Sequence, residues 1–509
     1  MLNRQKVTIF AQNFKLIDKM DLHKELILAS DEPKDKMMLS RLLEKGKVKR
    51  IAPKVYTTNL NDSPESIIRR NLLELLAWRF PGCIISHRSA QSLRPTKSGN
   101  IYITYSFTKR IDTYPGLILN VMEGPKPLDN DISMGFVNLY VSSEPRWMLE
   151  VLQPARRGKD GESKGLAQID VEHRLEDMLT RGGENALNDF RDKARTVSEP
   201  LNMPSEFEKL NHLISALLST REASVLTSET GKARAMGNPV DRHRVELFET
   251  LYDYLQSAHY PQLQASYHNE KEYQLFAFFE SYFSNYIEGT RFEVAEAKQI
   301  VDTGISIPMR REDSHDILGT YKLLSNRSEM QITPKSEDEL IEILRYRHRI
   351  MLEGRPNCTP GMFKQRANQA GDTVFIAPEL VEGTLRYGFR YYRALTSPLA
   401  RAIYMMFLCS EVHPFVDGNG RIARMMMNAE LSATDTARII VPTVFREDYL
   451  LALRKLSRNG QPDTYASVME RLQRFSAMIP CMDFESAKQF LQEANAFSDA
   501  ESAHINFHF

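Results

Sequence analysis

Residues 413–424 read His-Pro-Phe-Val-Asp-Gly-Asn-Gly-Arg-Ile-Ala-Arg and form the densest group of chemically active side chains in the sequence. An apolar run, Leu399 to Glu411, leads into this stretch, and a second run with helical spacing, Ile422 to Leu431, follows it. Two glycines that flank an asparagine fit a tight backbone bend, and the free amides of such a turn at the start of a helix bind anions. The stretch therefore predicts a phosphate site between two helices.

The side chains of the same stretch suit phosphoryl chemistry. Arg421 and Arg424 lie on the first turn of the second helix, where their guanidinium groups can reach phosphoryl oxygens. Asp417 supplies one hard oxygen ligand of the kind that Mg²⁺ uses beside nucleotide phosphates. His413 is suited to moving a proton near neutral pH, and Phe415 is interpreted as an apolar anchor. Each residue alone also fits a helix-capping turn, but their combination favours the phosphate site.

The stretch resembles the signature of the Fic (filamentation induced by cAMP) family, H-x-F-x-[D/E]-G-N-G-R-x-x-R, at every defined position. The similarity extends from about Tyr273 to Leu472. It implies a mainly α-helical core that transfers AMP from ATP, with Mg²⁺, to a Ser, Thr or Tyr hydroxyl of a target protein. His413 would be the general base, and Asp417 would hold Mg²⁺. The implied phosphate-binding residues are Gly418, Asn419, Gly420, Arg421 and Arg424.

A β-hairpin interrupts the helical pattern at residues 362–378, with Ala370-Gly371-Asp372 at its middle. This segment resembles the flap of Fic proteins, which pairs with the target chain like an added strand. An ordinary surface hairpin is the alternative interpretation. The resemblance makes these residues candidate target contacts: Phe363, Lys364, Gln365 and Arg366.

A second motif, Ser284-Asn285-Tyr286-Ile287-Glu288-Gly289, ends an apolar helix predicted over residues 273–289. Ser284 and Glu288 are four residues apart and share one helical face, and Gly289 ends the helix. The motif resembles the inhibitory [S/T]-x-x-x-E-[G/N] motif of Fic proteins. The resemblance implies that Glu288 pairs with Arg424 and prevents productive seating of the γ-phosphate. A solvated helix end is the alternative, and a second activity that removes AMP from a modified target stays open.

Residues 1–110 contain 21 Lys and Arg against 10 Asp and Glu, although the whole chain has no net charge. Two helices, Leu22 to Ala29 and Lys36 to Lys45, and a basic hairpin, Lys47 to Tyr56, are predicted in the order of a winged helix. The segment from residue 10 to 110 also loosely resembles the N-terminal part of AbiEi-type antitoxins. A packing domain with solvated basic residues is the alternative. The candidate duplex DNA contacts are Arg41, Lys45, Lys47, Lys49 and Arg50.

The length of 509 residues exceeds the ~250–300 residues at which single cores stop growing, so a multidomain chain is expected. The predicted parts are a small α/β winged-helix-like domain (1–110), an α/β continuation and linker (111–204), a helical Fic domain (205–482) and a C-terminal tail (483–509). No signal peptide or membrane span is expected, because the longest apolar stretch is far shorter than a bilayer requires. Four scattered cysteines favour a reducing, cytoplasmic location.

Two functions follow from these observations. The first is a protein adenylyltransferase, restrained by Glu288, that acts on another protein or on itself. The second is a DNA-binding regulator whose Fic core senses a nucleotide. The intact His413 favours the first, because a sensor needs no general base, whereas the basic N-terminal region favours some contact with DNA. Transfer of other phosphorus-containing groups and formation of a homodimer are open alternatives.

Overall fold

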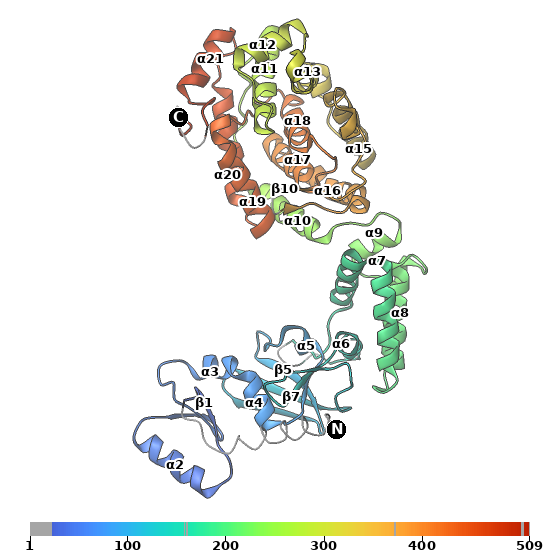
Figure 1. The fold of residues 1–509 in the computed structure, drawn as a ribbon, viewed down its shortest axis with the longest axis vertical. Coiled ribbons are helices and arrows are strands. Elements are labelled where there is room, and N and C mark those ends of the chain that lie inside the picture. Colours follow the sequence, from blue (N-terminus) through green and yellow to red (C-terminus); the bar gives the residue numbers. More distant parts are fainter. Residues whose placement is uncertain (1–22, 157, 159–160, 371–372, 500–502, 508–509) are drawn as a thin grey trace, which may run out of the picture. The chain divides into compact units, whose positions relative to one another are not determined.

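The computed structural model describes the chain except for residues 1–22, 157, 159–160, 371–372, 500–502 and 508–509. Its contacts divide the chain into two compact units, Met1–Ala235 and Met236–Phe509 (Figure 1). The first unit combines small sheets with helices, and the second is mainly helical. Within the described part of the chain, every helix is too short or too polar to cross a bilayer.

The first unit begins with a small antiparallel sheet and one helix. The strands β1 (Leu26–Leu28), β2 (Lys49–Ala52) and β3 (Val55–Thr57) pair in the order β1-β3-β2, and α2 (Pro33–Glu44) lies between β1 and β2 in the chain. The second predicted helix and the basic hairpin are confirmed. The first predicted helix, Leu22 to Ala29, is wrong, because residues 26–28 pair with β3 and this pairing overrides their local helical spacing. Leu22 itself lies outside the described residues.

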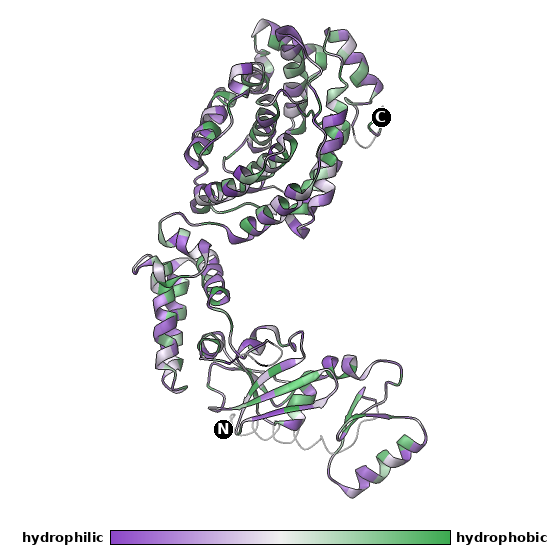
Figure 2. Ribbon diagram, turned by 180° about the vertical axis from the view of Figure 1, so that it is seen from behind, coloured by the Kyte–Doolittle hydropathy of each residue, from purple (hydrophilic) through white to green (hydrophobic). Residues whose placement is uncertain are grey.

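A six-stranded mixed sheet forms the centre of the first unit, in the order β6-β7-β5-β4-β9-β8. The long strands β5 and β7 run parallel in the middle, and Figure 2 shows hydrophobic residues along these strands. The six strands are β4 (Ile84–Ile85), β5 (Asn100–Tyr105), β6 (Lys109–Tyr114), β7 (Leu117–Glu123), β8 (Ile132–Ser133) and β9 (Tyr140–Val141). Four helices accompany the sheet: α3 (Pro64–Arg70), α4 (Leu72–Arg79), α5 (Arg88–Ser92) and α6 (Glu144–Val151).

The predicted linker is largely helical, which corrects the expectation for residues up to 204. The helix α7 (Gln168–Ser198) breaks at Gly183, whose φ of 70° is left-handed. Its apolar side chains, Leu175, Leu179, Leu187 and Phe190 among them, bury against α6 and α8 (Pro204–Leu217). Because α8 and α9 (Glu229–Ala235) pack in the same core, the first unit ends near residue 235 rather than at 204.

The second unit packs its helices around α17 (Pro398–Val412) and α18 (Asn419–Ser432), which are buried along almost their whole length. Hydrophobic and hydrophilic residues alternate along most of the surrounding helices (Figure 2), as expected for helices with one buried face. The surrounding helices are α10 (Arg242–Ser257), α11 (Glu270–Ile287), α12 (Val294–Thr303), α13 (Arg311–Leu324), α14 (Arg327–Met330), α15 (Glu337–Met351), α16 (Val381–Ala394), α19 (Arg446–Asn459), α20 (Pro462–Ala477) and α21 (Phe484–Glu493).

Two further predictions concern this unit. The hairpin is confirmed as β10 (Gln369–Ala370) and β11 (Thr373–Val374), and its turn, residues 371–372, lies outside the described residues. The predicted C-terminal tail is wrong in part, because α21 packs against α11 and α20. Ala487 and Leu491 are fully buried there, and their hydrophobic burial explains why this segment folds onto the core.

Candidate active site

Residues 413–418, called the signature loop below, connect α17 to α18. The loop begins where His413 adopts a left-handed conformation (φ 51°, ψ 59°) and ends α17. It ends at Gly418 (φ 76°), the N-cap of α18, where a side chain would also collide with Met351. The first amides of α18 have no partner within the helix, so they can bind an anion at the turn.

Asn419 and Phe415 give the signature loop its shape. The amide of Asn419 accepts a hydrogen bond from the Phe415 N–H (2.8 Å) and donates one to the Phe415 carbonyl (2.9 Å). The Phe415 ring is fully buried and stacks on His348 of α15, with ring centroids 3.7 Å apart. Phe415 is therefore an apolar anchor, as predicted, and the Asn419 side chain is occupied in holding the loop.

The His413 imidazole is half-buried and has two contacts. Its Nδ1 lies 3.4 Å from the Ser410 carbonyl, and its ring stacks on Phe375, with centroids 3.5 Å apart and planes within 7°. A proton on Nδ1 directed at Ser410 leaves Nε2 as the free acceptor. Burial, reinforced by the charge of Lys364, lowers the pKa of His413 to about 4, so the ring is neutral at pH 7.

Asp417 lies at the open side of the loop. Its side chain is 44% exposed, and its Oδ1 accepts a hydrogen bond from the Gly418 N–H (2.6 Å). Among the described residues, no group of three His, Cys, Asp or Glu side chains gathers to hold a metal ion. One exposed carboxylate beside an anion turn suits Mg²⁺, which is bound through one or two carboxylates together with substrate phosphates.

Arg424 is buried. Three of its hydrogen bonds go to the end of α11, and the Tyr449 side chain of α19 is a further partner. Its Nε donates to the Ser284 hydroxyl (3.0 Å), and its Nη2 donates to the Ser284 carbonyl (2.8 Å) and to Glu288 Oε1 (2.7 Å). The Glu288 carboxylate lies so close to Gly420 that a Cβ there would overlap Oε1. A carboxylate of the chain thus sits over the anion turn, held by the second arginine of the signature.

The end of α11 that carries Glu288 is held by hydrogen bonds of its own last turn and by one from α19. Glu288 is the C-cap, and Gly289 follows with a left-handed φ of 98°. The Arg446 side chain, at the start of α19, donates to the carbonyl of Ile287 (3.0 Å). The predicted face shared by Ser284 and Glu288 is therefore present and faces Arg424.

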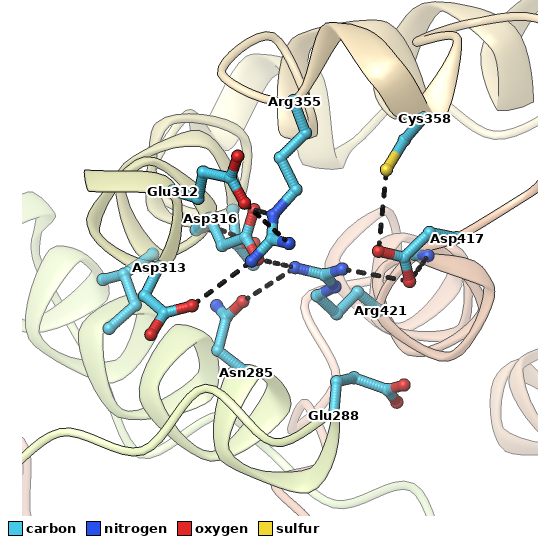
Figure 3. A network of polar contacts seen from close by, with 12 residues as sticks. Asn285, Glu288, Glu312, Asp313, Asp316, Arg355, Cys358, Asp417 and Arg421 are labelled. Carbon is cyan, nitrogen blue, oxygen red and sulfur yellow. Dashed lines mark hydrogen bonds and ion pairs between the residues drawn. The ribbon is translucent and has the colours of Figure 1, made fainter. Parts of the chain in front are cut away.

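Arg421 has different surroundings from Arg424. Its side chain is 3% exposed and forms an ion pair with Asp316 of α13 (2.6 Å) and a longer one with Asp417 (3.5 Å). Arg355 reaches the same Asp316 carboxylate from the other side (2.8 Å), so Asp316 lies between two arginines (Figure 3). Asn285 of α11 also accepts a hydrogen bond from Arg421 (3.4 Å). Of the two signature arginines, Arg421 thus already has a buried carboxylate partner on a neighbouring helix.

Residues 362–378, called the flap below, are anchored to the signature loop. Of the predicted target contacts, Phe363 packs against Phe415 and is 8% exposed, and Lys364 is 1% exposed. The Lys364 N–H donates to the Pro414 carbonyl (2.9 Å). Gln365 and Arg366 are exposed. Two of the four side chains therefore face the interior.

The predicted DNA contacts lie together in the first unit. Arg41 and Lys45 are at the end of α2 and just beyond it, and Lys47, Lys49 and Arg50 continue into β2. All five side chains are exposed, and none of them forms an ion pair with a described carboxylate.

Several residues of the site were not predicted from the sequence. His348 donates from Nε2 to the Asp417 carbonyl (3.0 Å) and accepts at Nδ1 from the Gly361 N–H (2.9 Å), so it joins the signature loop to the start of the flap. Asp316 and Phe375 also contact signature residues. No local sequence pattern marks any of them, because packing of distant elements brings them to the loop.

Comparison with known proteins identifies similar sequences for part of the chain. Residues 338–431 match the Fic/DOC family. The Fido domain-containing protein DDB_G0283145 of Dictyostelium discoideum is 31% identical over 103 residues, which cover 19% of this chain and 72% of that protein. Protein adenylyltransferase Fic of Drosophila persimilis is 24% identical over 243 residues, which cover 44% of this chain and 47% of that protein.

The chain therefore spans about half the length of the adenylyltransferase relative that it matches. Among solved structures, a fragment of Fic-1 from C. elegans covers 65% of this chain and 98% of its own chain, at 16% identity and a TM-score of 0.34.

Proposed function

The chain belongs to the Fic/DOC family, and on this premise we propose that it is a protein adenylyltransferase that transfers AMP from ATP to a hydroxyl group of a target protein. The similarity to protein adenylyltransferase Fic of Drosophila persimilis supports this proposal. The observation that carries it is the ion pair between Glu288 and Arg424 above Gly420, because an internal carboxylate there marks an anion site beside His413.

His413 is the proposed general base. The target hydroxyl oxygen attacks the α-phosphorus of ATP, its proton passes to Nε2 of His413, and the bond between the α- and β-phosphates breaks to release pyrophosphate. The low pKa of His413 keeps Nε2 unprotonated at neutral pH, so the ring is ready to accept that proton. Such transfer needs positioning and charge neutralisation more than covalent chemistry by the protein.

The phosphates of ATP have three proposed sets of partners. The first amides of α18, at Asn419 and Gly420, would bind phosphate oxygens, and Asp417 would hold Mg²⁺. The bound Mg²⁺ would neutralise phosphate charge. Arg424 would contact an outer phosphate once Glu288 leaves it, whereas Arg421, with its buried partner Asp316, would chiefly hold the start of α18 in place.

Glu288 is the proposed inhibitor of this reaction. Its carboxylate takes the place of a phosphate at Arg424 and above Gly420, so ATP can enter but its γ-phosphate is denied the guanidinium. The same placement is compatible with a second role of Glu288 in removing AMP from a modified target, which stays an alternative.

Labelled ATP tests the proposal. The full chain and its Glu288→Gly variant are incubated with ATP labelled at the α- or the γ-phosphate, with Mg²⁺ and candidate proteins, and protein-bound label is counted. We expect strong transfer of the α-label, and none of the γ-label, by Glu288→Gly. The addition of His413→Ala should reduce the rate by ~10²–10⁴, because the general base is lost.

A matched control is Glu270→Gly, which changes the same residue type at the other end of α11. This variant should behave like the wild type. Incorporation of the γ-label instead of the α-label would assign the chain to phosphoryl transfer. Equal α-label transfer by the wild type and Glu288→Gly would show that Glu288 does not inhibit.

A second candidate function is DNA binding by the first unit, and the five exposed basic residues from the end of α2 to β2 favour it. Such residues without acidic partners suit the phosphate backbone of duplex DNA, whose binding depends on released counterions. Retention of the wild-type chain on duplex DNA at low salt would support this function. It is compatible with adenylyl transfer by the second unit.

A further inference from the structure

The ring of His413 is held mainly by an aromatic contact from the flap. Its polar restraint, from Nδ1 to the Ser410 carbonyl, is 3.4 Å long, beyond the usual length of an N–H···O hydrogen bond. Phe375, the residue after β11, lies parallel to the imidazole at a centroid distance of 3.5 Å. The backbone of His413 is fixed by its left-handed conformation, but the torsion of its side chain is limited chiefly by this stack.

Phe375 is itself anchored through Asn368, on the other arm of the flap. The Phe375 N–H donates to the Asn368 carbonyl (3.1 Å), and the Asn368 side-chain amide donates to the Phe415 carbonyl in the signature loop (2.9 Å). Lys364 completes the anchor, because its ammonium donates to Asn368 Oδ1 (2.7 Å) and its N–H donates to Pro414. The chain of contacts returns to the loop that carries His413.

Lys364 is unusual as a lysine. It is 1% exposed and forms no ion pair with a described carboxylate, and its ammonium lies 5.8 Å from the centroid of the Phe375 ring. Burial of an ammonium group without a counter-charge is costly, so a role of Lys364 in the site would explain its place in the flap. Its position next to Phe375 and close to His413 gives it such a role.

We propose that Phe375 is a positioning residue, which fixes the plane of the His413 imidazole so that Nε2 faces the incoming hydroxyl, and that Asn368 and Lys364 hold Phe375 in place. The proposal rests on the proposed role of His413 as the base. Because the flap also carries the candidate target contacts Gln365 and Arg366, docking of a target on the flap and alignment of the base are coupled in one hairpin.

The electrostatic surroundings agree with this arrangement. The charged groups that face His413 are Lys364 from the flap, Glu288 from α11 and Asp417 from the signature loop, and Arg244 of α10 acts on Lys364. Burial contributes most to the low pKa of His413, and Phe375 covers one face of the ring. Removal of that cover admits water, so the pKa of His413 should rise from about 4 toward 6.5.

The test uses the full chain with Glu288→Gly and compares Phe375→Leu with Phe375→Tyr. Leucine keeps apolar volume but has no flat ring, whereas tyrosine keeps the stack. For Phe375→Leu we expect kcat to fall on the order of tenfold to a hundredfold with nearly unchanged Kd for ATP, since misplacement of about 1 Å has such a cost. The acid limb of its pH profile should move to higher pH, and Phe375→Tyr should restore both. Phe136→Leu, an exposed phenylalanine of the first unit, is the control.

A second measurement does not need activity. NMR of histidine-labelled protein follows the His413 ring protons, which the parallel Phe375 ring should shift upfield, and gives the pKa of His413 directly. Phe375→Leu and Asn368→Ala should both reduce the upfield shift and raise this pKa. The proposal would be overturned if Phe375→Leu left the His413 ring resonances unchanged. It would also be overturned if Phe375→Leu in the Glu288→Gly chain had the same kcat as Glu288→Gly alone, provided that Glu288→Gly is active. If the His413 ring protons show the expected upfield shift, and this shift falls in Phe375→Leu, but the chain transfers no AMP, only the proposed function would be refuted.

Discussion

At the scale of single residues, the partners of Arg424 explain why loss of Glu288 should activate rather than disorder the site. Arg424 makes two contacts with Ser284, which hold its guanidinium, and one with Glu288, the proposed inhibitor. Removal of Glu288 leaves the first two in place. The arginine therefore stays positioned and gains a free donor for phosphate.

A double-mutant cycle measures this relation. Glu288→Gly should raise AMP transfer strongly, and Glu288→Asp should raise it less, because a carboxylate one methylene shorter can still reach the guanidinium. Arg424→Ala combined with Glu288→Gly should lose the gain. The two changes would then be non-additive, as expected for contacting residues. Additive effects on kcat, measured across a range of ATP concentrations, would contradict the proposed pairing.

Asp316 is a second residue whose effect can be predicted. Asp316→Asn removes the charge that lies between Arg421 and Arg355, and Arg421 is too buried to exchange this partner for water. Loss of one member of a buried pair should lower the free energy of unfolding by about 3 kcal/mol. Asp313→Asn is the control, because its pair with Arg355 is partly exposed and should contribute at most about 1 kcal/mol. Urea denaturation of both variants compares these costs, and equal midpoints would refute the role of Asp316.

At the scale of elements, the basic stretch of α2 and β2 gives a prediction about DNA. Simultaneous Lys47→Glu, Lys49→Glu and Arg50→Glu changes should abolish retention on duplex DNA and leave AMP transfer unchanged, since the exposed cations lie in the first unit. In the wild type, log K should fall steeply with log salt, with a slope of about −0.9 per phosphate contact. The control changes Lys271, Lys322 and Lys335, which are exposed in the second unit, to glutamate. This variant reverses the same number of charges and should still bind DNA. Wild-type protein that shows no DNA binding at low salt would refute the prediction.

Elements with strong local spacing could be predicted from the sequence, and elements decided by packing could not. The helix ending at Glu288 and the two helices around the signature follow from apolar periodicity and glycines at their ends. By contrast, β1 has helical spacing but pairs as a strand, and α7 was missed because Gly182-Gly183 and many charges hide its buried face. The contacts of Asp316, His348 and Phe375 with the signature depend on tertiary packing, which no local pattern encodes.

At the scale of the whole molecule, the two units have separate hydrophobic cores. Separate cores predict two unfolding transitions in urea, and a nucleotide that binds near the signature should raise only the midpoint of the second unit. Circular dichroism of the Glu288→Gly chain with and without Mg²⁺ and ATP measures this. A single transition that shifts as a whole would contradict independent cores.

The transition of the first unit should also depend on pH. Burial lowers the pKa of His87 to about 4, below its ordinary value of 6.5, so the unfolded chain binds a proton that the folded unit excludes. Stability is then complete above about pH 6.5 and falls as the pH drops toward 4. His87→Gln should flatten this dependence between pH 6.5 and 4.5. An unchanged slope in that variant would show that other groups are responsible.

Under the proposed inhibition by Glu288, the contacts at the end of α11 would set how strongly AMP transfer is suppressed. Helix ends open locally at a free-energy cost well below that of global unfolding, and every 1.4 kcal/mol changes the open fraction about tenfold. Glu288 is a C-cap, supported beyond the helix by Arg446 and Arg424. The basal rate of AMP transfer by the wild-type chain should therefore depend on how often the last turn of α11 opens. A molecule that orders this turn should lower the basal rate, and one that loosens it should raise the rate.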